Sequence, residues 1–134
     1  MSQTNTEYGM RTRVNRPYEQ TVENVTAALK AEGFGVLTEI DVQATLKSKL
    51  DVEFRKYVIL GACNPSLAHQ ALSAELEIGL LLPCNVIVYE EADTSVVAIV
   101  DPHVMLGVIE NPALDAIANE ARTRLQRVIE TMNG

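Results

Sequence analysis

The sequence has no tryptophan, and its few aromatic side chains are two phenylalanines and four tyrosines. Because 47% of the residues are nevertheless hydrophobic, we expect an aliphatic core built mainly from Ala, Val, Ile and Leu. At 134 residues the chain has the usual size of one domain, and a domain of this size buries roughly two thirds of its unfolded surface. We therefore predict a single domain over residues 1–134, with residues 1–6 disordered and no structural disulfide required.

Positive charge is also in short supply. Eleven Lys and Arg residues stand against 18 Asp and Glu residues, which gives a formal net charge of −7. Phosphate binding relies on clustered basic side chains, so nucleic acid is not expected as a partner. The longest apolar runs, such as Val96–Val100, are too short to span a bilayer, so no membrane association is expected. The first ten residues lack the basic start and apolar stretch of a secretory signal, which favours a cytoplasmic location.

The familiar catalytic motifs are missing as well. The chain has no Gly-rich phosphate loop, no Gly-x-Ser-x-Gly elbow and no His-Glu-x-x-His helix. Its two cysteines are not arranged as Cys-x-x-Cys, so no zinc motif is present. In a reducing compartment such cysteines are free thiols, ligands or redox groups more often than a disulfide.

Hydrophobic periodicity and capping residues predict the elements. Tyr8 to Val14 alternates with the period of a half-exposed strand, and Pro17 opens a helix that Gly33 ends. Further strands are expected at 34–40, 55–62, 85–91 and 94–100, and further helices at 42–50, 64–79 and 112–132. The stretch 103–109 is predicted to be a turn or a packed connection.

This order of elements predicts an α+β fold whose helices pack on one face of a sheet. The strand at 55–62 is apolar on both sides, which indicates a central strand that is covered on both faces. Helices on one face alone would leave apolar side chains exposed on the other, and such patches mark interfaces. We therefore predict a homodimer, or else a second covering layer.

Cys63 and Cys84 occur in mirrored contexts, Cys63-Asn64-Pro65 and Pro83-Cys84-Asn85. Cys63 ends a predicted strand just before a helix N-cap, where free N–H groups and the helix dipole favour a thiolate. Cys84 begins the next strand. If the two strands are antiparallel, both cysteines lie at the same end of the sheet; if they are parallel, they lie at opposite ends.

Three interpretations of the cysteines stay open. They could form a soft-metal site for copper(I) or zinc, with His69 and His103 as further ligands. They could act in thiol or persulfide redox chemistry. They could also be small buried hydrophobic residues, as free cysteines often are, with both histidines solvated.

Acidic residues provide two more candidates. On a helical wheel Glu75 falls near the middle of the apolar arc of helix 64–79, and a carboxylate facing the core needs a partner. It is therefore included with Cys63 and Cys84 in a candidate ligand or thiol site, although packing of its stem at the helix edge also explains it. Glu39 and Asp41 share a strand face and could form an acid pair, whereas a capping role explains Asp41 without chemistry.

Three ordered segments carry a resemblance to a known family: residues 33–42 (GFGVLTEIDV), 59–65 (ILGACNP) and 82–86 (LPCNV). The chain resembles domain-of-unknown-function family 302 over 8–132. The resemblance implies a TATA-binding-protein-like β-α-β4-α fold with short inserted helices, and a dimer. Its antiparallel strands would place Cys63 and Cys84 at one sheet end. Many relatives have Gly-Asn-Pro without the cysteine, so the chain looks like a cysteine-bearing branch in which Asn64-Pro65 is structural.

The sequence thus leaves three functional hypotheses. The first is a module that binds a small ligand, a soft metal or a thiol at Cys63 and Cys84, with Glu75, His69 or His103 assisting. The second is a thiol-dependent enzyme or sulfur carrier that uses Cys63. The third is a structural homodimer in which both cysteines are inert.

Overall fold

The computed structural model describes residues 5–134. The expected disorder over residues 1–6 falls mostly outside this range. Within the range, Thr6 donates its backbone N–H to the carbonyl of Gly9 at 2.8 Å.

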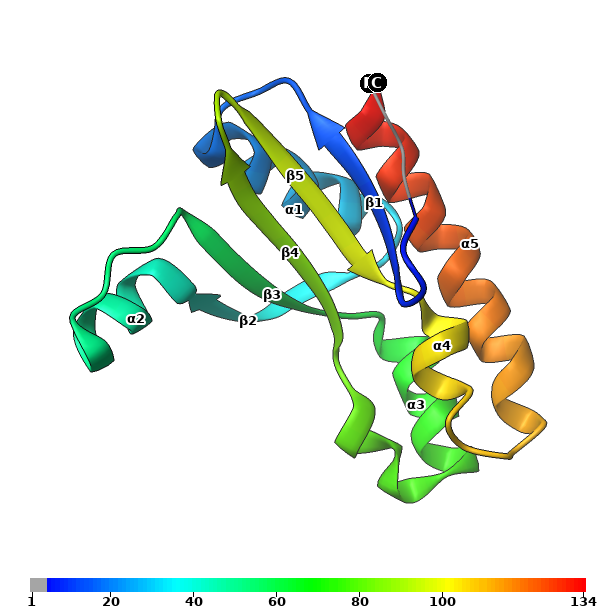
Figure 1. Cartoon of the computed structure of the whole chain (residues 1–134). Coiled ribbons are helices and arrows are strands. Elements are labelled where there is room, and N and C mark those ends of the chain that lie inside the picture. The colour runs from blue at the N-terminus through cyan, green and yellow to red at the C-terminus, as the bar shows by residue number, and fades with distance from the viewer. Residues whose placement is uncertain (1–4) are drawn as a thin grey trace.

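The sheet has five strands in the spatial order β1-β5-β4-β3-β2, and every neighbouring pair is antiparallel. Strands β2 to β5 therefore form a meander, and β1 pairs with the outer side of β5 (Figure 1). The predicted α+β class is confirmed, while the relation to the TATA-binding-protein fold stays a prediction. The strands are β1 (Gly9–Val14), β2 (Gly35–Asp41), β3 (Tyr57–Cys63), β4 (Cys84–Glu91) and β5 (Thr94–Val100).

Two long helices, α1 and α5, pack on one face of this sheet and close the main core. Their apolar stripes meet the strand residues that point to the same side, such as Leu60, Val86 and Val97, all of which are buried. No helix in residues 5–134 has the length and apolar character needed to cross a membrane. The helices are α1 (Tyr18–Ala31), α2 (Val42–Leu50), α3 (Pro65–Ala74), the 3-10 helix η1 (Leu76–Leu81), α4 (Pro102–Leu106) and α5 (Ala113–Asn133).

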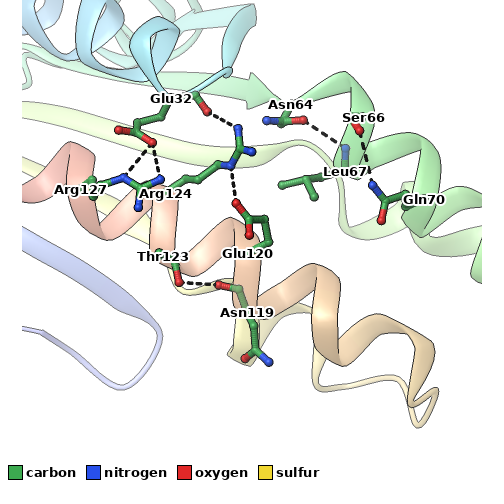
Figure 2. A network of polar contacts seen from close by, with 10 residues as sticks. All are labelled: Glu32, Asn64, Ser66, Leu67, Gln70, Asn119, Glu120, Thr123, Arg124 and Arg127. Atoms are coloured by element: carbon green, nitrogen blue, oxygen red, sulfur yellow. Dashed lines mark hydrogen bonds and ion pairs between the residues drawn. The ribbon is translucent and has the colours of Figure 1, made fainter.

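The C-terminus of α1 is fixed by a Schellman motif. Gly33 has a φ of +85°, and its N–H donates to Lys30 O while the N–H of Phe34 donates to Leu29 O. Figure 2 shows how α5 is attached to this turn. Arg124 Nη1 donates to the carbonyl of Glu32 at 3.1 Å, and two N–H groups of Arg127 reach Glu32 Oε1 at 3.0 and 2.9 Å. These bonds connect the two helices that cover the sheet.

The predicted helix caps are present. Asp41 Oδ1 accepts from the N–H of Ala44 at 2.9 Å at the start of α2, so its capping role is confirmed. Asn64 Oδ1 accepts from the N–H of Leu67 at 3.1 Å at the start of α3 (Figure 2). Asparagine and proline therefore begin α3 at the residue that the sequence indicates.

The helix expected over 64–79 is wrong at its C-terminal end. Helix α3 stops at Ala74, and Glu75 is its C-cap with an extended backbone (φ −150°, ψ 98°). The chain then forms η1, so Glu75 does not lie on the apolar arc that a continuous helix would give it. The turn or connection expected at 103–109 contains α4, which Asp101 caps by accepting from the N–H of His103.

The two faces of the sheet differ in burial. Val58 and Leu60 of β3 are buried under the helices, whereas Tyr57 and Ile59 on the opposite face are only half-buried. Strand β3 is therefore central in the sheet, as expected, but within one chain only one of its sides is fully covered. Since apolar side chains point to both faces, the second face keeps an accessible apolar surface.

One part of the molecule makes few packing contacts. The segment 35–56, which we call the β2–α2 arm, consists of the edge strand β2, helix α2 and the connection to β3, and it extends from one side of the sheet (Figure 1). None of the side chains of α2 is buried. Several large apolar side chains in this arm are exposed, namely Leu37, Ile40, Leu50, Val52 and Phe54.

Gly61 in the middle of β3 generates a first prediction. A Cβ there would collide with Thr38 Oγ1 on β2 and would lie 2.7 Å from Pro83 Cγ. We expect Gly61→Ala to lower the free energy of unfolding by about 1–3 kcal/mol, as overpacked sites do. Gly35→Ala is the control because nothing lies within 4 Å of its Cβ. Urea denaturation measures both, and equal stabilities would contradict the close packing at Gly61.

Candidate functional site

The pairing of β3 with β4 brings the two cysteines to one end of the sheet. Ala62 is the register partner of Cys84, and Cys63 follows Ala62 as the last residue of β3. Cys84 is the first residue of β4. The antiparallel alternative for these strands is therefore confirmed, and with it the shared sheet end.

A cavity of about 330 Å³ lies at this end, between the sheet and helices α3, α4 and α5. Both cysteines line it, and none of the described residues in its wall carries a charged side chain. Leu37 and Leu72 belong to the lining and are also exposed, so the cavity opens to solvent beside them. The lining residues are Phe34, Leu37, Thr38, Ala62, Cys63, Asn64, Leu67, Ala68, Ala71, Leu72, Gly79, Leu82, Pro83, Cys84, Pro102, Met105, Leu106, Ile117 and Ala121.

Local geometry explains why a cavity forms here. The chain leaves β3 at Cys63 and enters α3 at once, because Asn64 caps that helix and Pro65 occupies its first turn. Asn64 is buried, and its Nδ2 would lie 2.9 Å from a Cβ at Gly33, so α3 begins against the end of α1. Helix α3 therefore departs from the sheet edge, and the space between them is lined by apolar side chains.

The two thiols have different surroundings. Cys84 is 8% exposed and belongs to the main core, whereas Cys63 is half-buried at the cavity wall. Burial, and to a lesser degree the negative charge of a Cys63 thiolate, raises the pKa of the Cys84 thiol to about 11. The Cys84 thiol is therefore neutral at physiological pH and belongs to the apolar wall.

The other candidates from the sequence lie elsewhere. His69 and His103 are exposed, and neither lines the cavity. Glu75 does not line it either; its Oε1 accepts from Asn111 Nδ2 at 3.2 Å, which gives the carboxylate a structural partner. Within residues 5–134, no group of three or more His, Cys, Asp or Glu side chains could hold a metal ion. The structure thus brings Cys63 and Cys84 together without the two histidines.

The Glu39 and Asp41 carboxylates lie on a different part of the surface, near Tyr18 on α1. The pKa of the Tyr18 hydroxyl is raised to about 12. Burial is the largest cause, and the negative charges of Asp41, Glu39 and Glu19 add to it. The two carboxylates therefore act on the same hydroxyl, as their shared strand face predicts. Neither of them lines the cavity.

The contribution of α4 to the cavity wall was not expected from the sequence. Pro102, Met105 and Leu106 line the cavity from α4. The signal for this helix was present in Asp101-Pro102, a cap followed by proline at the first helical position. The sequence predicts an apolar arc on α3, and the structure shows that Leu67, Ala68 and Ala71 on this helix line the cavity.

The raised pKa of Cys84 predicts how stability depends on pH. The folded-state pKa of about 11 exceeds the ordinary value of 9.0, so the unfolded chain loses this proton first. The contribution to stability is complete below pH 9.0 and is lost as pH rises to about 11. Two pKa units correspond to about 3 kcal/mol.

Urea unfolding under reducing conditions between pH 8 and 11 measures this loss. The difference between wild type and Cys84→Ala isolates it, since the other titrating groups, Tyr18 included, are common to both proteins. Cys63→Ala is the matched control and should retain the decline. A Cys84→Ala protein that loses stability as steeply as wild type would contradict the assignment.

Comparisons with known proteins agree with this architecture. Residues 10–132 match the family described as "Domain of unknown function DUF302". The structure is similar to the crystal structure of the uncharacterized conserved protein DUF302 from Bacillus stearothermophilus, with a TM-score of 0.87 and 32% sequence identity. That similarity covers 95% of this chain and 99% of the other. No curated protein matches the chain. The chain therefore belongs to the DUF302 family, a family defined by its domain and not by an activity.

Proposed function

We propose that this protein binds a small apolar molecule in the cavity lined by Cys63 and Cys84. The observation that carries the proposal is the cavity itself, with its volume of about 330 Å³ and its uncharged wall. Small-molecule sites are concave and mostly apolar, with a few polar groups that orient the ligand. Here Thr38, Asn64 and the Cys63 thiol are the polar groups, and apolar side chains form most of the rest.

The two cysteines have separate roles in this proposal. Cys84 is neutral and buried, so it acts as a small hydrophobic side chain in the wall. Cys63 is half-buried, lines the cavity and stands directly before the N-cap of α3, so its thiol stays accessible. Cys63 is therefore the thiol that can bond to or ligate a bound molecule.

Binding accounts for the site better than catalysis does. A cysteine nucleophile is usually activated by a neighbouring base, which a third group then orients. The cavity wall contains no His, Asp, Glu or Lys within the described residues, so Cys63 has no such base in the cavity. A soft metal is less favoured for a related reason, because the raised pKa of Cys84 opposes the thiolate that copper(I) or zinc prefers.

A neutral fluorescent dye, N-phenyl-1-naphthylamine, tests the proposal. We expect wild type to bind the dye with increased emission, and Ala68→Phe to weaken binding at least about tenfold by filling the cavity. The control is Ala116→Phe, the same substitution at an exposed position of α5 outside the cavity. Bound dye should also slow alkylation of Cys63 by iodoacetamide, with Cys63→Ser identifying the labelled residue.

Two results would overturn the proposal. The first is dye binding that Ala68→Phe and Ala116→Phe affect equally, since the dye would then bind outside the cavity. The second is co-purification of one copper or zinc per chain that both Cys63→Ser and Cys84→Ser abolish. That result would make the cysteines a metal site.

We further propose that the protein is a homodimer in which the β2–α2 arm contacts a second copy. Strand β2 is an edge strand, and unpaired edges readily accept another strand. A two-fold axis beside β2 would pair it antiparallel with its own copy, which makes the interface self-complementary. The exposed Leu37, Leu50 and Phe54 in this arm would then be buried at the interface.

Light scattering at micromolar concentration tests this assembly. We expect a dimer for wild type, and a rise of about a hundredfold in the dimer dissociation constant for Leu50→Glu, which places a charge in the interface. Leu80→Glu is the control, because Leu80 is even more exposed than Leu50 but lies in η1, outside the arm. A monomeric wild type, or dissociation caused equally by both variants, would contradict the arm interface.

A further inference from the structure

The sheet face opposite α1 and α5 carries a second concavity, separate from the cysteine cavity. Its volume is about 380 Å³, and it lies over β1, β5, β4 and the start of β3. The floor includes Ile87 and Ala98, which are register partners on β4 and β5. None of its lining residues lines the cysteine cavity, so the two sites are independent.

Aromatic rings form one wall of this groove. The rings of Tyr57 and Tyr89 are stacked, with centroids 5.5 Å apart and an interplanar angle of 9°. Tyr8 lines the groove as well and is largely exposed. Burial raises the pKa of Tyr57, and the neighbouring Tyr89 and Tyr8 contribute to the same shift, so the Tyr57 hydroxyl is neutral at physiological pH. Tyr57 therefore contributes no negative charge to the groove.

Arg11 is the only charged residue that lines the groove within the described chain. Its Nη2 donates to Tyr89 Oη at 3.4 Å, which is a long hydrogen bond. No carboxylate in residues 5–134 forms an ion pair with Arg11, whereas Arg13, on the same face of β1, is paired with Glu91. The chain has a net charge of −7, and yet the N–H donors of this partly buried guanidinium have no anionic partner within the described residues.

We propose that this groove binds a small planar aromatic carboxylate. The ring would lie on the apolar floor beside the stacked tyrosines, and the carboxylate would accept two N–H groups from Arg11. Asn85, which is exposed at the groove wall, supplies a further donor. Arg55, whose guanidinium lies 5.7 Å from the centre of the Tyr89 ring, adds positive charge nearby.

The probe for this site is 2-naphthoate, with binding measured by calorimetry on the full chain. We expect Arg11→Gln to raise the dissociation constant at least about tenfold, the loss expected for one charge-assisted pair. Arg13→Gln is the matched control, because it removes the same charge from the same face of β1 outside the groove. The neutral analogue 2-naphthylmethanol should bind wild type and Arg11→Gln equally.

Three results would overturn this inference. One is equal weakening by Arg11→Gln and Arg13→Gln, which would mean that only the overall charge matters. Another is weakening by the cavity-filling Ala68→Phe, which would place naphthoate in the cysteine cavity. The third is no binding at millimolar naphthoate together with concentration-dependent shifts of the Tyr57 and Tyr89 resonances, which would assign the groove to a second copy.

Discussion

The antiparallel register between β3 and β4 is the constraint on which the rest of this structure depends. Ala62 faces Cys84 across the ladder, so the end of one strand and the start of the next occupy the same sheet edge. Gly61 permits this arrangement because Thr38 and Pro83 occupy the space where a side chain would project. A register shift of one residue would exchange the faces of β4 and move Cys84 out of the core.

The end of α1, the start of α3 and the middle of α5 meet at that edge. Asn64 caps α3 and also lies against Gly33, where α1 ends in its Schellman motif. Arg124 of α5 reaches the same turn through the carbonyl of Glu32 (Figure 2). Because these ends are fixed by hydrogen bonds, α3 departs from the sheet in one direction and leaves an apolar space beside the cysteines.

The two concave regions of the molecule have opposite character for a physical reason. The cysteine cavity lies among side chains that face the core, where an unpaired charge is costly, and its wall is uncharged. The groove on the other sheet face borders solvent, where an arginine and three tyrosine hydroxyls keep partial hydration. A sheet with one face under helices and one accessible face thus borders a neutral cavity and a cationic groove in one small domain.

Local signals in the sequence predicted most elements correctly where a cap or a turn residue fixed them. Helix ends are marked by Asp41, Gly33 and Asn64-Pro65. Each of them forms hydrogen bonds with residues a few positions away in the chain, so these signals depend on the local sequence alone. The predicted position of Glu75 was wrong because the helical wheel assumed that α3 continues past Ala74, where no residue nearby in the sequence indicates a helix end. The helix ends there as Ile78 of η1 enters the small cluster with Ala71, Leu114 and Ile117, and that packing comes from distant parts of the chain.

The sequence by itself determined the α+β class, the aliphatic core, the capped helix starts and the placement of both cysteines at strand ends. Only the tertiary structure decided that the strands carrying Cys63 and Cys84 are antiparallel and that His69, His103 and Glu75 stay outside the cavity. It also decided that Arg11 has no carboxylate partner within residues 5–134. The division has one physical cause. Caps and periodicity act between residues a few positions apart, whereas strand direction, cavity walls and ion pairing depend on contacts between segments far apart in the chain.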